Sequence, residues 1–223
     1  MQAKLIDYMG TDVSVVDAAR VSFRKKSESK VMSDGDTKLV RYLAKHGHFT
    51  PFTHATITIH EKVPIFVARQ RFKHVVGFSY NEVSRRYVSD EPEFHYPREW
   101  RLRPESIKQG STDETIKTFW NNPSAEPISQ AYESVVMAAK SCYNDMISSG
   151  VCPEQARMVL PQSMYTEYYV TGSLFAWARA YNLRIETHAQ KEIQELAREW
   201  NLVIRPLFPV TWGALVDEET NSR

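Results

Sequence analysis

The chain has 223 residues, enough to bury one large hydrophobic core or two small ones. Its 28 lysines and arginines against 27 aspartates and glutamates leave a formal net charge of +1, so the overall composition favours neither a nucleic acid nor a membrane as partner. Any anion must therefore be recognised locally. We also expect no secretory signal and no membrane helix, because no apolar run approaches the roughly 20 residues that a membrane helix needs.

The two cysteines, Cys142 and Cys152, belong to no CxxC pair and no zinc-type cluster. We expect reduced thiols in a cytoplasmic protein rather than a disulfide, and we expect no metal site. Helical spacing predicts that Cys142 lies on the apolar face of its helix, where it would act as a small hydrophobic residue. Neither thiol has the surroundings of an activated nucleophile.

The first part of the chain predicts two strands and three helices: a strand over 4–7, helices over 13–21 and 36–45, a strand over 54–62 and a helix over 64–72. In the second strand Ala55, Ile57 and Ile59 alternate with polar residues, which indicates one buried face. Gly47 is placed to end the helix before it, and Pro64 suits the first turn of the helix that follows.

The stretch 101–126 is polar and is expected to be a surface excursion within a single domain over 1–223, because a helical pattern resumes directly after it. A long helix follows up to Gly150, with apolar residues at three-to-four spacing: Ile128, Tyr132, Val135, Ala139, Cys142 and Met146. A short helix over 153–160, a strand over 164–171 and helices over 173–181 and 188–204 complete the chain. Helices without a regular βα alternation favour the α+β class, with a small mixed or antiparallel sheet and several long helices.

The densest concentration of charged and polar residues is the stretch 69–87. Arg69 and Lys73 are four residues apart in a predicted helix and would share a face. Arginine forks, hydroxyls and backbone N–H groups together suit a phosphate. The same charges would also suit a solvated basic helix or an RNA surface, but aromatic residues, Asn81 and Glu82 interrupt them.

This stretch resembles the flavin-dependent thymidylate synthases, whose signature is Arg-His-Arg followed after seven or eight residues by Ser. Lys73-His74-Val75 stands at the first part, departing from the signature at two positions, and Ser84 stands at the last. Further blocks that look like the family follow in family order: 18–22, 45–52, 64–70, 156–161 and 182–190. Several ordered blocks are far more specific than one short motif.

The resemblance implies the reductive methylation of dUMP to dTMP. It implies 5,10-methylenetetrahydrofolate as carbon donor and FAD, reduced by NADPH, as hydride carrier. It further implies a homotetramer with active sites shared between subunits. The expected ligands are thus dUMP and folate, with no nucleic acid and no membrane.

The resemblance also implies site residues. Those expected at dUMP are Gln70, Arg71, Lys73, Glu82, Ser84, Arg85, Arg86, Arg157 and Arg184. Arg184 corresponds to the arginine set against the uracil ring and is the expected catalytic residue. Attack at C6 of the ring pushes negative charge toward N3 and its neighbouring oxygen, and a fixed guanidinium stabilises that charge.

The residues expected at FAD are Ser22, His48, Thr50, Lys73, His74, Val75, Glu82, Ser173, Phe175 and Arg179. The family usually has Asn and Arg where this chain has Ser173 and Phe175. Arg179, one helical turn beyond Phe175, is the candidate for a substitute charge.

Two other classes of protein stay open at this point. One is an RNA- or single-strand-binding protein that uses 69–87 as a basic and aromatic surface, although the balanced charge and the lack of an RRM, KH or zinc signature disfavour it. The other is a structural protein that has kept the fold and lost its flavin contacts. Visible colour of the purified protein discriminates the enzyme from both.

Overall fold

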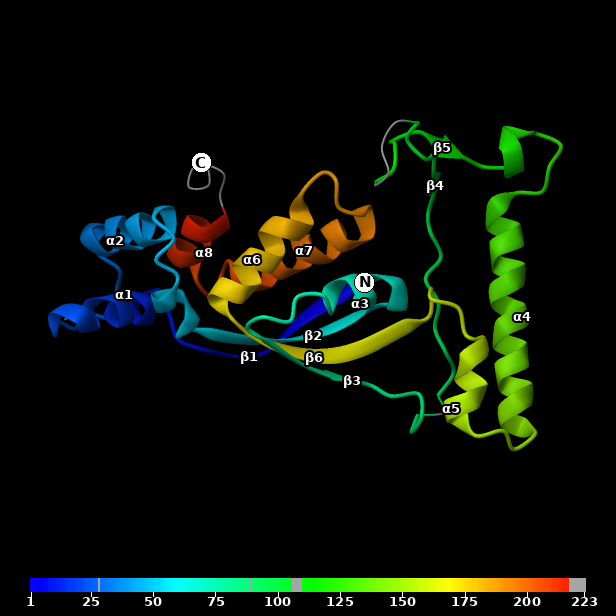
Figure 1. The fold of residues 1–223 in the computed structure, drawn as a ribbon, viewed down its shortest axis with the longest axis horizontal. Helices are drawn as coiled ribbons and strands as arrows, with labels where there is room; N and C mark the ends of the chain where they lie inside the picture. Colours follow the sequence, from blue (N-terminus) through cyan, green and yellow to red (C-terminus); the bar gives the residue numbers. More distant parts are fainter. Residues whose placement is uncertain (28, 89, 106–109, 217–223) are drawn as a thin grey trace. The chain divides into compact units, whose positions relative to one another are not determined.

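The computed structural model describes residues 1–27, 29–88, 90–105 and 110–216, which form an α+β fold (Figure 1). Its strands and helices are β1 (Gln2–Met9), α1 (Asp12–Arg20), α2 (Asp34–Lys45), β2 (Thr56–Pro64), α3 (Ile65–Arg71), β3 (Phe78–Glu82), β4 (Trp100–Arg101), β5 (Thr115–Ile116), α4 (Ile128–Ser148), α5 (Pro153–Ala156), β6 (Tyr165–Ser173), α6 (Leu174–Ile185), α7 (Lys191–Ile204) and α8 (Pro209–Val216). The expected fold class is confirmed.

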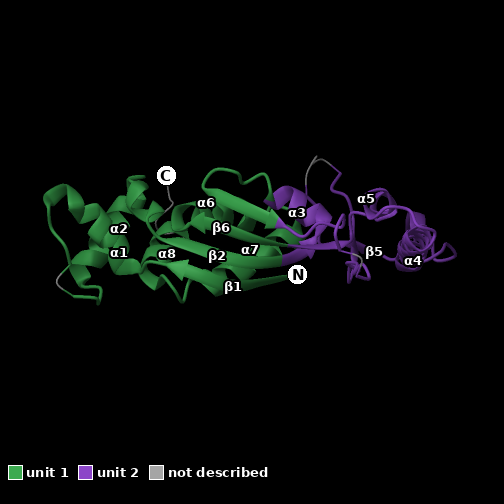
Figure 2. Ribbon diagram, turned by 90° about the horizontal axis from the view of Figure 1, so that it is seen from below, with its two compact units in different colours: residues 1–61, 72–81, 168–223 green, residues 62–71, 82–167 purple. Residues whose placement is uncertain are grey.

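Four strands form a sheet in the order β1-β2-β6-β3, and β4 pairs with β5. The chain divides into two compact units (Figure 2). Unit 1 comprises residues 1–61, 72–81 and 168–223, and unit 2 comprises residues 62–71 and 82–167. Among the described residues, none of the helices combines the length and the apolar character needed to cross a membrane. The single domain expected over 1–223 stays a prediction.

The core of unit 1 lies between the sheet and two helices, α6 and α7, which lie side by side (Figure 1). The buried face predicted for β2 is confirmed, since Ala55, Ile57 and Ile59 are fully buried. Trp177 of α6 packs against Trp200 of α7 with ring centroids 5.5 Å apart, and its indole N–H donates to the carbonyl of Ile57 at 3.2 Å. A buried indole therefore fixes α6 to the strand beneath it.

A second group of helices in unit 1 consists of α1, α2 and α8, which contact one another. The sequence pattern did not predict α8. Thr211, Trp212, Ala214, Leu215 and Val216 are all buried, so the helix has no polar face of its own and shows no amphipathic period.

The N-terminus of α2 has a capping box that is tied to α1. Ser33 Oγ accepts from the Asp36 N–H at 3.2 Å, and Asp36 Oδ2 accepts from the Ser33 N–H at 2.9 Å. Arg20 of α1 reaches Asp36 Oδ1 at 2.5 Å. The hydrogen bonds from Ser33, followed by the charge of Arg20, hold the pKa of Asp36 below its ordinary value.

Asp36→Asn is expected to lower the free energy of unfolding at pH 7 by about 1 kcal/mol. Because the pKa of Asp36 is depressed in the fold, its stabilising contribution is present above the unfolded pKa of about 3.9 and is lost as the pH falls through the folded value. The difference in free energy of unfolding between wild type and variant should therefore become smaller below about pH 4. Denaturant unfolding at several pH values measures it, with Asp34→Asn, an exposed residue of the same turn, as control. A gap that does not change with pH would contradict the assignment.

The helix expected over 64–72 is shorter than predicted, because β2 continues through Pro64 and α3 ends at Arg71. Lys73 thus lies beyond the helix, and the predicted shared helical face of Arg69 and Lys73 is wrong. The chain turns instead at Gly77, whose φ of +82° favours glycine, and then enters β3. The sequence pattern did not predict β3, because charged residues lie on both sides of this strand. Farther along, α6 extends to Ile185, and a turn over 186–190 delays α7.

Of the apolar stripe predicted for the long helix α4 in unit 2, Ile128, Tyr132, Ala139 and Met146 are half-buried and none is fully buried. The residues that α4 buries are Val136 and Tyr143, whereas Val135 is 65% exposed and Cys142 is exposed. The helix contacts α5 and the turn over 157–159, which cover one narrow side of it. Because α4 carries apolar residues on more than one side, their spacing could not show which side is covered.

The excursion expected over 101–126 contains a small hairpin, in which Trp100 pairs with Ile116 and Arg101 with Thr115. The Trp100 indole donates to Ser129 Oγ at 3.0 Å and packs edge-on against Tyr132 of α4. These contacts fasten the hairpin to α4 within unit 2.

Candidate functional site

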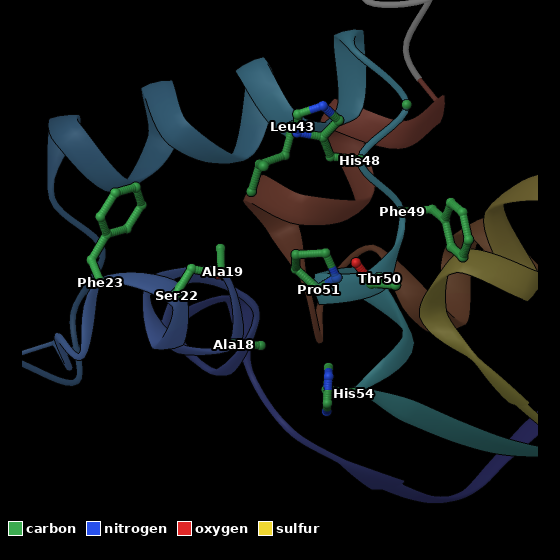
Figure 3. Close-up of a pocket in the computed structure, with 11 residues that line it drawn as sticks. Ala18, Ala19, Ser22, Phe23, Leu43, His48, Phe49, Thr50, Pro51 and His54 are labelled. Carbon is green, nitrogen blue, oxygen red and sulfur yellow. The ribbon is translucent and has the colours of Figure 1, made fainter.

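Three residues of unit 1 that the sequence predicts at FAD line one cavity of about 560 Å³ (Figure 3). Ser22 lies in the turn after α1, His48 follows α2, and Thr50 begins the next turn. The sequence missed the other lining residues, although most belong to the two blocks that resemble the family: Ala18, Ala19, Phe23, Leu43, Gly47, Phe49, Pro51 and His54.

The position of His48 follows from the way α2 ends. The Gly47 N–H donates to Ala44 at 3.2 Å and the His48 N–H donates to Leu43 at 2.9 Å, with Gly47 at a φ of +68°. This is the Schellman arrangement, and it confirms the predicted helix end at Gly47. Hydroxyl groups and an imidazole beside alanine and proline suit a ligand with a flat apolar body and a polar edge.

Two segments of unit 2 that are distant in the sequence, residues 82–85 and 157–166, meet with Ile65 around a second cavity of about 210 Å³. Four residues expected at dUMP line it: Glu82, Ser84, Arg85 and Arg157. The remaining lining residues, which the sequence did not single out, are Ile65, Val83, Leu160, Met164 and Thr166.

Hydrogen bonds to β6 fix the first segment of this cavity. The Val83 N–H donates to the Glu167 carbonyl at 2.9 Å, and Thr166 Oγ1 donates to Glu82 Oε1 at 2.6 Å. Ser84 Oγ accepts from the N–H and the Nε of Arg86 at 3.3 and 3.4 Å. The Tyr87 N–H closes the turn onto the Ser84 carbonyl at 2.9 Å. Ser84 is therefore held in a turn, and its hydroxyl together with the nearby arginines would suit an anion.

The arginines around this turn differ in their partners. Arg85 is 12% exposed and donates to the carbonyl and to Oδ2 of Asp90, so it ties the turn after Ser84 to Asp90. Arg86 is exposed, and its guanidinium lies 4.9 Å from the ring centroid of Tyr87. Arg157 is exposed and donates through Nε to the Glu154 carbonyl at 3.4 Å. Arg157 and Ser84 are thus the best placed of the predicted residues for a phosphate at this cavity.

The other residues expected at dUMP do not line this cavity. On α3, Gln70 is half-buried and Arg71 is fully buried, while Lys73 is exposed in the turn beyond it. Arg184 lies near the end of α6 in unit 1, where its Nε donates to His74 Nε2 at 2.8 Å. The roles predicted for these residues stay predictions.

The residues expected at FAD on α6 have local contacts. Ser173 caps the helix, its Oγ accepting from the Ala176 N–H at 3.2 Å. Phe175 stacks on Phe49, which lines the first cavity, with ring centroids 5.2 Å apart. Arg179 donates to the Val76 carbonyl at 3.3 Å, next to Val75, which is 67% exposed. Phe175 therefore contacts the cavity lining through Phe49 and does not line the cavity itself.

Residues 4–210 match the family described as thymidylate synthase complementing protein. The chain belongs to this family. Over 216 residues it is 37% identical to the flavin-dependent thymidylate synthase of Thermosipho africanus, covering 96% of this chain and 90% of that protein. It is 35% identical over 211 residues to the Thermus thermophilus enzyme of the same name, covering 95% and 74%.

A solved structure similar to this fold is the UMP/dUMP methylase PolB from Streptomyces cacaoi bound with 5-Br dUMP. Its TM-score is 0.79 at 28% identity, covering 96% of this chain and 93% of that chain. The expectations that this chain resembles the flavin-dependent thymidylate synthases and is an enzyme are confirmed.

Proposed function

We propose that this family member is a flavin-dependent thymidylate synthase that methylates dUMP to dTMP. Its carbon donor is 5,10-methylenetetrahydrofolate, and its hydride carrier is FAD reduced by NADPH. The observation that carries the proposal is the meeting of Ser84 and Arg157, 73 residues apart, at one cavity of a chain whose family match spans residues 4–210. The match is far more specific than the basic stretch that suggested RNA binding.

The nucleotide's phosphate pairs with Arg157 and accepts from Ser84, because a guanidinium and a hydroxyl complement its oxygens. Glu82 repels a phosphate and suits a hydroxyl of the sugar, and Thr166 holds its carboxylate at 2.6 Å. Ser84 orients the nucleotide and is not a nucleophile, because Arg86, the group that contacts its oxygen, is not a base.

The residues of the cavity in unit 1 fit part of a flavin nucleotide. Ser22, His48 and Thr50 would hold its polar groups, and Ala18 and Pro51 give it an apolar wall. When bound, the reduced flavin supplies the hydride that turns a methylene group into a methyl group. The further contacts expected from Lys73, His74, Val75, Glu82, Ser173, Phe175 and Arg179 belong to the same proposal.

We further propose a homotetramer whose active sites are shared between subunits, with dUMP and folate as its ligands. Each chain has a mass of 25.8 kDa, so light scattering should give four times that value. A protein that stays monomeric in the presence of dUMP and FAD would contradict the shared site. The cytoplasmic location expected from the two reduced thiols stays a prediction.

His48→Ala is expected to weaken FAD binding about 10-fold, because it removes one hydrogen-bonding group from the cavity in unit 1. Titration of the apoprotein with FAD, followed by flavin fluorescence, measures the effect. His46→Ala is the matched control, because His46 is exposed two residues earlier and packs on Tyr42 instead of lining the cavity. Wild-type affinity in the His48 variant would indicate that the flavin does not bind in this cavity. A wild-type protein that binds no flavin would refute the proposed function.

A further inference from the structure

The side chain expected to act on the uracil ring, Arg184, is held by a histidine 110 residues earlier in the chain. Its Nε donates to Nε2 of His74 at 2.8 Å. A guanidinium has donors and no acceptor, so His74 Nε2 must carry a lone pair in this contact. We therefore assign His74 as a neutral imidazole with its proton on Nδ1.

The backbone of His74 is held by an aromatic cluster of unit 1. His74 is 7% exposed, and its carbonyl accepts from the Tyr80 hydroxyl at 2.7 Å. Tyr80 packs against Phe72 and Tyr168, with ring centroids 5.1 and 6.1 Å away. Tyr168 donates to Glu61 Oε2 at 2.6 Å, and both residues are buried. Packed rings and buried hydrogen bonds thus restrict where His74 can lie.

The turn that carries His74 also lies against α6, the helix that carries Arg184. The Gly77 carbonyl accepts from the Ser173 N–H at 3.4 Å, and Arg179 donates to the Val76 carbonyl at 3.3 Å. A Cβ added at Gly77 would come within 2.8 Å of the Ala176 Cβ, so the approach of the turn to the helix requires glycine. The backbone segments that carry His74 and Arg184 are therefore packed against each other.

We propose that His74 is a positioning residue for Arg184. By accepting from Nε it sets the plane in which the two terminal nitrogens of the guanidinium lie. Under the proposed function these nitrogens would donate to the planar edge of the pyrimidine base. A guanidinium that already has its reactive orientation stabilises developing charge on the ring without a cost of reorganisation. The consequence for turnover rests on the proposed function, whereas the pairing and the tautomer do not.

Isosteric substitutions of His74 separate this role from a general structural one. Glutamine places its amide oxygen near the position of Nε2 and can accept from Arg184, whereas asparagine places its amide near Nδ1 and cannot. His74→Ala should lower kcat for dTMP formation about 10- to 100-fold, as expected for a lost hydrogen bond to a charged group. His74→Gln should stay within about 3-fold of wild type, and His74→Asn should behave like His74→Ala.

A double-mutant cycle tests whether His74 acts through Arg184. In an Arg184→Ala background, His74→Ala should change kcat less than about 2-fold, because the partner it positions is gone. The flavin content of every variant is measured by absorbance and kcat is expressed per bound flavin, so that losing the FAD contact proposed for His74 is not counted as lost turnover. An equal loss of kcat in both backgrounds, or equal rescue by asparagine and glutamine, would overturn the proposal.

Nitrogen NMR of protein labelled at its histidines gives a readout that needs no nucleotide. The His74 signals, identified by their loss in His74→Gln, should show a protonated Nδ1 and an unprotonated Nε2, and the Nε2 signal should move in Arg184→Ala. A protonated Nε2 in a protein that makes dTMP normally would refute the pairing alone. No dTMP from a protein with the expected NMR signals would instead refute the proposed function.

Discussion

Arg184→Ala should lower kcat for dTMP formation about 100- to 1,000-fold, the usual loss when one fixed donor to developing charge is removed. The effect should fall mainly on kcat, because Arg184 is proposed to stabilise charge that appears on the uracil ring only during attack at C6. Steady-state rates of dTMP formation at saturating dUMP measure it.

Arg198→Ala is the matched control for this prediction. Arg198 is exposed on α7, in the same unit as Arg184, and donates to Gln194 Oε1 at 3.2 Å. Its removal should change kcat less than about 2-fold, as for ordinary surface substitutions. If Arg184→Ala raised KM for dUMP and left kcat unchanged, Arg184 would contribute uniform binding rather than catalysis.

Arg157→Ala should weaken dUMP binding about 10- to 100-fold, because it removes a charged donor from the phosphate. Binding of deoxyuridine, which has no phosphate, should change less than about 2-fold. Calorimetric titration of wild type and variant with both ligands therefore isolates the contribution of the phosphate.

The control for Arg157 is Arg98→Ala, which removes an exposed arginine of the same unit that does not line the cavity. It should leave both affinities unchanged. Equal weakening of dUMP and deoxyuridine by Arg157→Ala would place Arg157 at the sugar or the base, or would indicate a structural role. It would contradict the phosphate assignment.

Local sequence patterns predicted the elements that have one buried face or that end at a residue with a special backbone conformation. The alternation in β2 is visible because one face of the strand is buried, and the end of α2 is visible because Gly47 supplies a positive φ. The pattern failed for α4, where apolar residues occur on several sides and tertiary contact decides which are buried. It also failed for α8, which is buried almost all round.

The candidate site depended on the family resemblance more than on local pattern. No periodicity relates Ser84 to Arg157, or Ser22 to His48, yet each pair lines one cavity. The contact between His74 and Arg184 could not be predicted at all, because it depends on how the turn after α3 packs on α6. Thr166, which fixes Glu82, was missed because a threonine in a strand gives no signal in the sequence.

The most direct measurement of the proposed function is the conversion of dUMP by the purified, FAD-loaded protein with 5,10-methylenetetrahydrofolate and NADPH. Mass spectrometry of the nucleotides should show dTMP when all components are present and none when the folate is left out. Chemical reduction of the flavin should replace NADPH and still give dTMP. If the flavin-loaded protein forms no dTMP with either reductant, the assignment as a flavin-dependent thymidylate synthase is contradicted.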